Sequence, residues 1–308
     1  MKKVIGVDLG GTNIVTAIVD SKGKVLGRDK RPTQVSLGAK KVITRIADSA
    51  RASLQASGLS LSDVAAVGIG SPGPLNPKSG VILNWVNGGW KNVPLGPELK
   101  KNFKKRVFIE NDANVAALGE AWVGAGRGEK VVLCLTLGTG VGGGLILDGK
   151  IYAGAWDVGC EIGHIVVNPD GPLTPYGNSG ILEQYSSATG IVRLAKEVGL
   201  EAPGGGTLQA YEVQELARKR NQTALRVYAE AGRYLGIGLT TAIHLYNPSV
   251  VIFSGGVSGA GDLLFKPMHK ELKKRCFPQS LKGVKFRIAK LGDNMGVVGA
   301  ARLAYQQL

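Results

Sequence analysis

The stretch IGVDLGGTNIVTAIVD, residues 5–20, combines two apolar runs with a short break of turn-forming residues. The runs, 5–9 and 14–19, flank two glycines, a threonine and an asparagine, and Asp8 stands near the end of the first run. Apolar runs of this length with turn residues between them predict two adjacent strands. A third strand is predicted from Val25, after a further polar turn.

A near-repeat of this pattern begins the second half of the chain. Residues 131–154, VVLCLTLGTGVGGGLILDGKIYAG, again give an apolar strand, a glycine turn, a second strand and an Asp-Gly turn. In the first half, residues 39–57 have apolar positions at helical spacing and end at Gly58, and a predicted strand at 107–112 leads into another helix. Strands alternating with helices indicate an α/β fold. The repeat predicts two similar domains whose glycine turns face one another across a cleft.

Composition narrows the possible classes of protein. The chain has 308 residues, enough for two domains, and 44% of them are hydrophobic. We expect a cytoplasmic protein, since no apolar run reaches the ~18 residues of a membrane helix and Met1 leads directly into the first strand. The three cysteines are too scattered for a disulfide framework. The net charge of +15 fits solvated helix faces or an anionic ligand, and no nucleic-acid-binding motif accompanies it.

The two glycine turns suggest phosphate binding. Glycine lets backbone N–H groups approach a ligand closely, and successive N–H groups suit phosphates. Each turn continues into a strand, which excludes a Walker A loop and a dinucleotide fingerprint, although tight hairpins alone would also need glycine. A carboxylate beside such a turn indicates a cation, so we expect ATP with Asp8 serving Mg²⁺, directly or through water. The candidate phosphate-binding residues are Gly10, Gly11, Thr12, Asn13, Gly138, Thr139 and Gly140.

Five segments together resemble one protein family. DLGGTN, ENDAN, LGTGVGGGLILDGKIYAGA, CEIGH and SGGV occur in the order found in the ROK family of sugar kinases, glucokinase-like members especially, over essentially the whole chain. The resemblance implies a two-domain actin-like, ribonuclease H-like duplicated fold with an interdomain cleft, and a homodimer. We expect a small domain of 1–111 plus 293–308 and a large domain of 112–292. Gly255 and Gly256 would lie near the adenosine.

Asp112 lies where a predicted strand meets a helix, and it is the candidate residue that contacts the phosphoryl acceptor. From the residues alone this aspartate suits either a helix N-cap or a carboxylate that orients an attacking hydroxyl and accepts its proton. A helix N-terminus is expected to keep the carboxylate ionised. The resemblance implies that Asp112 is the catalytic base and that Asn111 binds the sugar.

Glu161 and His164 in CEIGH are three residues apart, a spacing that also occurs in metal sites. A metallohydrolase is therefore an alternative, although the His-Glu-x-x-His pattern is missing. Several sugar hydroxyls need both hydrogen-bond donors and acceptors. The residues that the resemblance assigns to the sugar are Gly73 (by its backbone), Asn87, Asn111, Asp112, Glu161, His164 and Glu183.

One motif departs from the family. Many ROK proteins bind structural zinc through Cys-x-Cys-Gly-x-x-Gly-Cys-x-Glu, and the matching stretch here is TPYGNSGILE, with Thr174, Tyr176 and Ile181 in the cysteine positions. These side chains cannot form the usual zinc site, so no structural zinc is expected. Pro172 and Pro175, with packing by Tyr176 and Ile181, are expected to order the loop instead.

The sequence therefore predicts an ATP-dependent hexokinase or glucokinase that phosphorylates the 6-hydroxyl of glucose. Fructose, mannose, N-acetylmannosamine and N-acetylglucosamine remain alternative acceptors, and polyphosphate remains an alternative donor. A non-catalytic sugar-sensing regulator is the alternative from a different class. Sugar and nucleotide are the expected partners, without nucleic acid or membrane.

Overall fold

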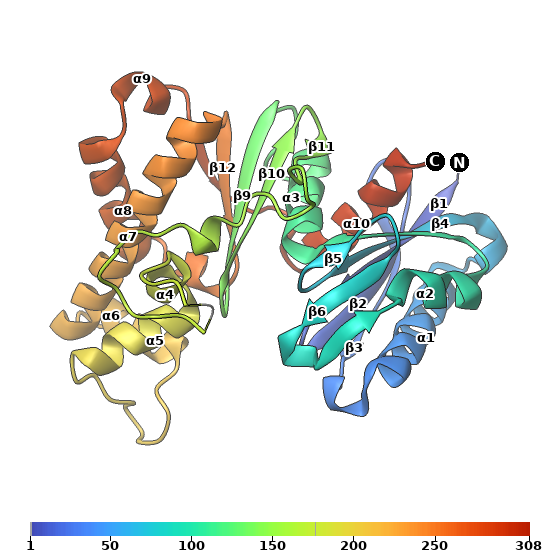
Figure 1. Cartoon of the computed structure of the whole chain (residues 1–308), viewed down its shortest axis with the longest axis horizontal. Coiled ribbons are helices and arrows are strands. Elements are labelled where there is room, and N and C mark those ends of the chain that lie inside the picture. The colour runs from blue at the N-terminus through green and yellow to red at the C-terminus, as the bar shows by residue number, and fades with distance from the viewer. Residues whose placement is uncertain (1, 176) are drawn as a thin grey trace. The chain divides into compact units, whose positions relative to one another are not determined.

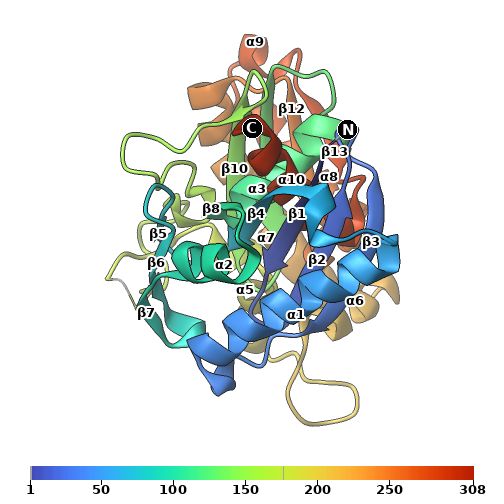
Figure 2. The ribbon, with the colours of Figure 1, turned by 90° about the vertical axis from the view of Figure 1, so that its right-hand side faces the viewer.

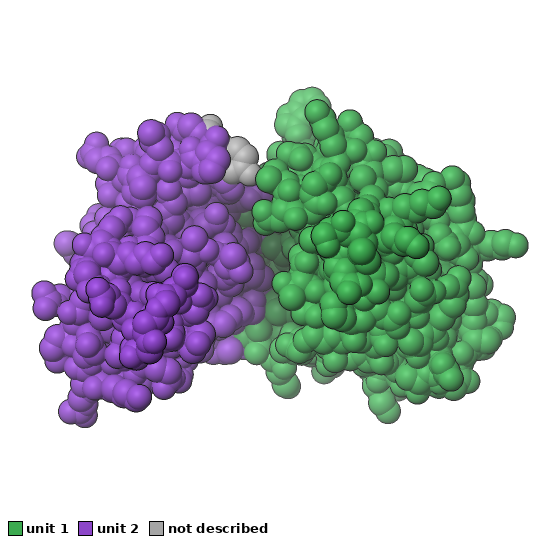
Figure 3. All heavy atoms as spheres, turned by 90° about the horizontal axis from the view of Figure 1, so that it is seen from below, with its two compact units in different colours: residues 1–132, 144–160, 289–308 green, residues 133–143, 161–288 purple. Residues whose placement is uncertain are grey.

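The computed structural model describes residues 2–175 and 177–308 (Figure 1). The chain forms two compact units, which are coloured separately in Figure 3. Unit 1 comprises Met1–Val132, Gly144–Cys160 and Ala289–Leu308, and unit 2 comprises Leu133–Gly143 and Glu161–Ile288.

Unit 1 is built on a five-stranded sheet in the order β3-β2-β1-β4-β8. The three N-terminal strands are antiparallel, and β4 and β8 run parallel to β1. The predicted strands and the glycine turn of the opening stretch are confirmed. The strands are β1 (Lys3–Leu9), β2 (Asn13–Val19), β3 (Val25–Pro32), β4 (Val64–Ser71) and β8 (Arg106–Asn111).

Helices cover both faces of this sheet. On one face lies α1 (Ala39–Ser57), which Figure 2 shows along the sheet. Its buried residues join the apolar core, and it ends, as predicted, at Gly58 in a left-handed conformation. The other face packs against α10 (Met295–Gln306), and α3 (Asp112–Val123) packs against α10. A Cβ at position 299 would lie 1.6 Å from the Val115 carbonyl oxygen, so only glycine allows α3 and α10 to cross this closely.

Unit 1 extends beyond the expected small domain because of this helix packing. α3 begins at Asp112, just after the expected boundary, but it contacts α10 and β4 of unit 1. The remaining elements of unit 1 are β5 (Leu75–Asn76), β6 (Val81–Trp85), β7 (Trp90–Val93), α2 (Leu95–Phe103) and β11 (Lys150–Ile151).

The second sheet has the order β11-β10-β9-β12-β13. Its first two long strands, β9 (Val131–Leu137) and β10 (Val141–Leu147), repeat the strand, glycine turn and strand of the opening stretch, as predicted. β12 (Val250–Ser254) is buried throughout and pairs in parallel with β13 (Lys285–Ile288). The ring centroids of Phe253 and of Phe265 from α8 (Asp262–Arg275) lie 4.9 Å apart, so this helix packs on the sheet.

The helices of unit 2 follow one another in the second half of the chain. They are α4 (Glu183–Ser186), α5 (Ala188–Glu197), α6 (Ala210–Arg218), α7 (Gln222–Tyr246), α8 (Asp262–Arg275) and α9 (Pro278–Leu281). Within the described residues, none of the helices combines the length and apolar character that a membrane crossing requires.

Candidate functional site

The parallel strands of unit 1 bring two predicted acidic residues to the same edge of the sheet. In the strand register Asp8 pairs with Gly70, and Gly70 pairs with Glu110, two residues before Asp112. Asp8 and Asp112 therefore lie at the carboxyl ends of β1 and β8. Ligands of open α/β sheets usually bind at this edge.

Asp8 lies in an unfavourable environment for an unpaired negative charge. Burial and the nearby charges of Asp112 and Asp293 raise the pKa of Asp8 to about 6, against the opposing effect of Arg28. The first turn of α10 crowds the carboxylate, since a Cβ at Gly296 would lie 2.3 Å from its Oδ2 atom. A cation fits this environment, because it would offset the burial and the mutual repulsion of the carboxylates.

The N-cap of α3 is Asn111 and not Asp112. The Asn111 side chain accepts hydrogen bonds from the backbone N–H groups of Ala113 and Asn114, at 2.9 and 3.2 Å. Asp112 occupies the first helical position and also accepts from the Ala113 N–H, at 2.8 Å. Burial nevertheless raises the pKa of Asp112, because desolvation outweighs the hydrogen bonds from the backbone.

Glu110, a buried carboxylate next to Asn111 in the chain, was not predicted from the sequence. Glu110 is 7% exposed and accepts hydrogen bonds from the Asn111 N–H and the Asn114 side chain, at 2.8 and 3.2 Å. Burial is the main cause of its raised pKa. The position of Glu110 in ENDAN was the only signal. Its contacts indicate that Glu110 orients Asn111 and the first turn of α3.

The Gly10–Asn13 turn is held in place by Thr33, the residue that follows β3. Gly10 donates its N–H to the Asn13 carbonyl oxygen at 2.9 Å, and the Thr33 hydroxyl donates to the Gly10 carbonyl oxygen at 2.6 Å. Gly11 and Thr12 are exposed at the tip. This arrangement leaves the tip accessible to a ligand.

Gly73 and Asn87 lie on neighbouring segments of unit 1. Gly73 has a φ of +82°, and a Cβ there would lie 2.3 Å from the Asn84 carbonyl oxygen, so the loop requires glycine. Asn87 is exposed in a short 3-10 helix (Val86–Gly88) between β6 and β7. The buried rings of Trp85 and Trp90, with centroids 4.9 Å apart, anchor that connection.

In unit 2, the second glycine turn lies beside the SGGV segment. Gly255 has a φ of +86°, and a Cβ there would lie 2.3 Å from the carbonyl oxygen of Leu137, the residue before Gly138. Gly256 is exposed at the start of a 3-10 helix (Gly256–Ala260). The structure thus brings the two glycine segments of unit 2 together.

Two segments that carry predicted sugar residues of unit 2 contact Val141, where the turn enters β10. Glu183 Oε2 accepts the Val141 N–H at 3.0 Å. Gly163 lies between Glu161 and His164, on a short 3-10 helix (Ile162–His164). A Cβ at Gly163 would lie 2.1 Å from the Val141 carbonyl oxygen. Among the described residues, no three or more His, Cys, Asp and Glu side chains are grouped to hold a metal ion.

The loop in the zinc-motif position is ordered by hydrogen bonds and ring packing. Asn168 lies outside this loop and donates its N–H to the Gly180 carbonyl oxygen at 3.1 Å. The Asn168 side-chain amide donates to the Tyr185 and Tyr234 hydroxyls at 3.0 and 3.3 Å, and the centroids of these two rings lie 3.8 Å apart. Ile181 is buried, as expected, and forms a β-bridge with Val166. The expected packing of Tyr176 lies outside the described residues.

The remaining predictions for this loop concern Thr174 and the prolines. The Thr174 hydroxyl donates to the Asn178 side chain, and the Thr174 N–H donates to the Asn178 carbonyl oxygen at 2.7 Å. Pro172 contributes a carbonyl oxygen to the Gly180 N–H at 3.0 Å. These hydrogen bonds join residues 172–174 to residues 178–180.

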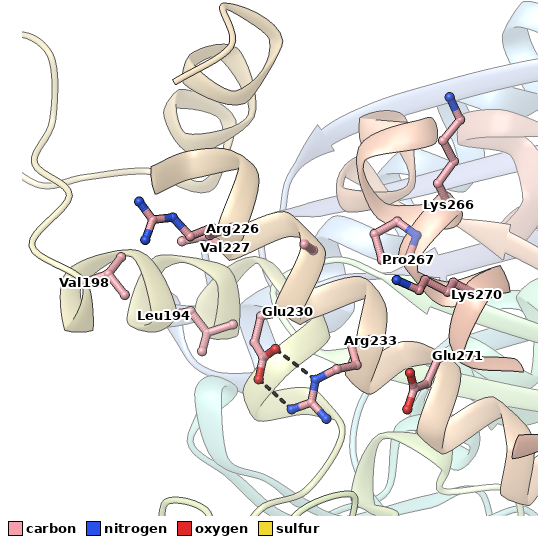
Figure 4. A pocket seen from close by; sticks show the side chains of 11 residues that line it. Leu194, Val198, Arg226, Val227, Glu230, Arg233, Lys266, Pro267, Lys270 and Glu271 are labelled. Atoms are coloured by element: carbon pink, nitrogen blue, oxygen red, sulfur yellow. Dashed lines mark hydrogen bonds and ion pairs between the residues drawn. The ribbon is translucent and has the colours of Figure 1, made fainter. Parts of the chain in front are cut away.

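A groove of about 770 Å³ lies elsewhere in unit 2, among α5, α7 and α8 (Figure 4). Its lining includes Val198, Arg226 and Lys270, and Glu230 pairs there with Arg233 at 2.6 Å. Among the described residues, none of those that line this groove is a predicted site residue.

The fold is that of the two-domain, actin-like α/β class. The model of the ROK family matches residues 4–307, so the chain belongs to the ROK family. It is 39% identical to a glucokinase from Halalkalibacterium halodurans, over 98% of this chain and 95% of that one.

Two solved structures are similar over nearly their full length. A ROK hexokinase from Thermus thermophilus has a TM-score of 0.87 and 32% identity, covering 99% of this chain and 98% of that chain. A ROK family glucokinase from Streptomyces griseus, in complex with glucose and AMPPNP, has a TM-score of 0.82 and 35% identity, covering 99% of both chains.

Proposed function

We propose that this ROK protein is an ATP-dependent glucokinase, which transfers the γ-phosphoryl group of MgATP to the 6-hydroxyl of glucose. The observation that carries the proposal is the juxtaposition of Asp8 and Asp112 at the carboxyl edge of one sheet. The 35% identity to a glucokinase that binds glucose and AMPPNP supports the choice of both substrates.

Asp112 is the proposed base. Its carboxylate accepts a hydrogen bond from the sugar 6-hydroxyl, orients that oxygen toward the γ-phosphorus and takes its proton as the new bond forms. A pKa raised by burial suits this role, because a carboxylate that binds a proton more strongly is a better acceptor at neutral pH. Glu110 and the cap made by Asn111 hold the first turn of α3 in position.

Asp8 would hold the magnesium ion, directly or through water. Bound Mg²⁺ supplies positive charge that neutralises the phosphate oxygens. The N-terminal turn of α10, packed on Asp8 through Gly296, fixes the carboxylate in place. The net charge of +15 favours the approach of an anionic nucleotide.

The glycine turns are the proposed phosphate cradles, Gly10–Asn13 in unit 1 and Gly138–Gly140 in unit 2. Gly255 and Gly256 are assigned to the adenosine. Backbone N–H groups in such turns provide donors for phosphate oxygens without side-chain entropy loss. The proposed sugar contacts are Gly73, Asn87, Asn111, Asp112, Glu161, His164 and Glu183.

The proposal is tested by measuring sugar phosphate formation over a panel of acceptors and donors. The acceptors are glucose, fructose, mannose, N-acetylmannosamine and N-acetylglucosamine, each with ATP, GTP or polyphosphate. We expect the highest kcat/KM for glucose with ATP. A higher value for another pair would reassign the substrate, and no turnover of any sugar would favour the non-catalytic sensor.

We further propose that the protein folds and works without structural zinc. Zinc supplies ~10 kcal/mol or more of folding free energy in small zinc domains. Here Asn168 bonds to Gly180 of the loop through its N–H, and through its side chain to Tyr185 and Tyr234 on two helices. Mass spectrometry should find no stoichiometric zinc, and prolonged chelation should leave the melting temperature and kinase activity unchanged. About one zinc per chain, with loss of stability on its removal, would contradict this.

A further inference from the structure

The glycine turn of unit 2 is held by the chain segment that also carries a proposed sugar residue. At the exit of the turn, Glu183 accepts the Val141 N–H at 3.0 Å. At its base, the Ala188 N–H donates to the Gly138 carbonyl oxygen at 2.8 Å. At its tip, the Thr189 hydroxyl donates to the Thr139 carbonyl oxygen, also at 2.8 Å. Residues 183–189 therefore hold the turn at three points.

The contact with Glu183 leaves little room for independent movement. A Cβ at Gly140 would lie 2.3 Å from Glu183 Oε2, so the carboxylate packs directly on the backbone of the turn. Gly163 packs on the Val141 carbonyl oxygen from the segment that holds Glu161 and His164. A shift of either segment that carries proposed sugar residues would therefore displace the backbone that follows the turn.

We propose that residues 183–189 couple sugar binding to nucleotide binding. The proposal rests on the proposed function, since Glu183 then contacts the sugar and Gly138–Gly140 the phosphates. One carboxylate oxygen of Glu183 is bonded to the Val141 N–H. A sugar that binds the other oxygen therefore fixes Glu183, and with it the exit of the turn. Ordering the turn before the nucleotide arrives lowers the cost of binding it. By thermodynamic linkage, the nucleotide strengthens sugar binding by the same factor.

Thr189 is a positioning residue in this arrangement and provides the cleanest test. Its side chain is exposed, and its hydroxyl reaches the turn rather than the proposed sugar residues. Thr189→Val removes that hydrogen bond and keeps the branched shape of the side chain. The matched control is Thr44→Val on α1, where the hydroxyl of another exposed threonine donates to the Lys40 carbonyl oxygen at 3.1 Å.

Calorimetry would measure glucose binding with and without AMPPNP, and AMPPNP binding with and without glucose. For the unmodified protein we expect each ligand to tighten the other by the same factor. In Thr189→Val we expect AMPPNP binding in saturating glucose to weaken about 2–10-fold, as for one lost hydrogen bond, with the coupling factor reduced. Glucose binding alone should stay unchanged, and Thr44→Val should behave like the unmodified protein.

The outcomes separate the two proposals. If the unmodified protein binds both ligands without coupling, or if Thr189→Val keeps the full coupling factor, the coupling role of residues 183–189 is wrong and the kinase proposal stands. If the unmodified protein binds neither glucose nor AMPPNP, the proposed function is wrong and the coupling falls with it.

Discussion

Asp112→Asn should lower kcat for glucose phosphorylation by about 10²–10⁴-fold, the usual contribution of a general base. The amide keeps the shape of the side chain but cannot take the proton of the attacking hydroxyl. Glucose binding should persist with a weaker affinity, because the orienting hydrogen bond is altered. Steady-state kinetics and calorimetry on the same preparation would measure both effects.

The structure makes this substitution a clean test, because Asn111 accepts two backbone hydrogen bonds as the cap of α3. The melting temperature of Asp112→Asn should therefore stay close to that of the unmodified protein. Asp262→Asn is the matched control, since this exposed aspartate is the first residue of α8 and pairs with Lys266 at 2.9 Å. Near-normal kcat in Asp112→Asn would show that the residue has only a structural role.

Asp8→Ala should lower activity by about 10²-fold or more at ordinary magnesium concentrations, because metal-ion stabilisation of transferring phosphate is worth several kcal/mol. Excess Mg²⁺ should restore part of the lost activity if the carboxylate helps to hold the ion. Rates measured over a magnesium titration would give the apparent affinity for the ion in both proteins.

The control for Asp8 is Asp48→Ala, which removes an exposed carboxylate from α1 that pairs with Arg51 at 2.7 Å. Asp48→Ala should keep the magnesium dependence of the unmodified protein. An Asp8→Ala protein with an unaltered magnesium titration would rule out the metal role. Asp8→Asn, which keeps the side-chain volume against Gly296, distinguishes loss of charge from altered packing.

The opening stretch and its near-repeat were sufficient to predict the strands and both glycine turns, because apolar runs and turn residues are local signals. Gly58 likewise marked the end of α1. The division of the chain into units depends on packing between distant segments. α3 crosses α10 through Gly299, about 180 residues further along the chain, and no local pattern reports such a contact.

Residue types at the candidate site could be read from motifs, but their environments could not. Sequence alone did not show that burial raises the pKa of Asp112, or that Glu110 is buried against Asn111. The contact between Thr189 and the glycine turn joins residues 50 positions apart and has no sequence signal of its own. Desolvation and long-range hydrogen bonds arise only when the chain is folded.

The central claim is that this chain phosphorylates glucose at the 6-hydroxyl. Its most direct test is to mix the purified protein with ¹³C-labelled glucose and MgATP and to follow the products by nuclear magnetic resonance. We predict glucose 6-phosphate and ADP in equal amounts, with formation of both abolished or strongly slowed in Asp112→Asn. Glucose that binds but remains unmodified, or phosphate released to water without a sugar phosphate, would contradict the account.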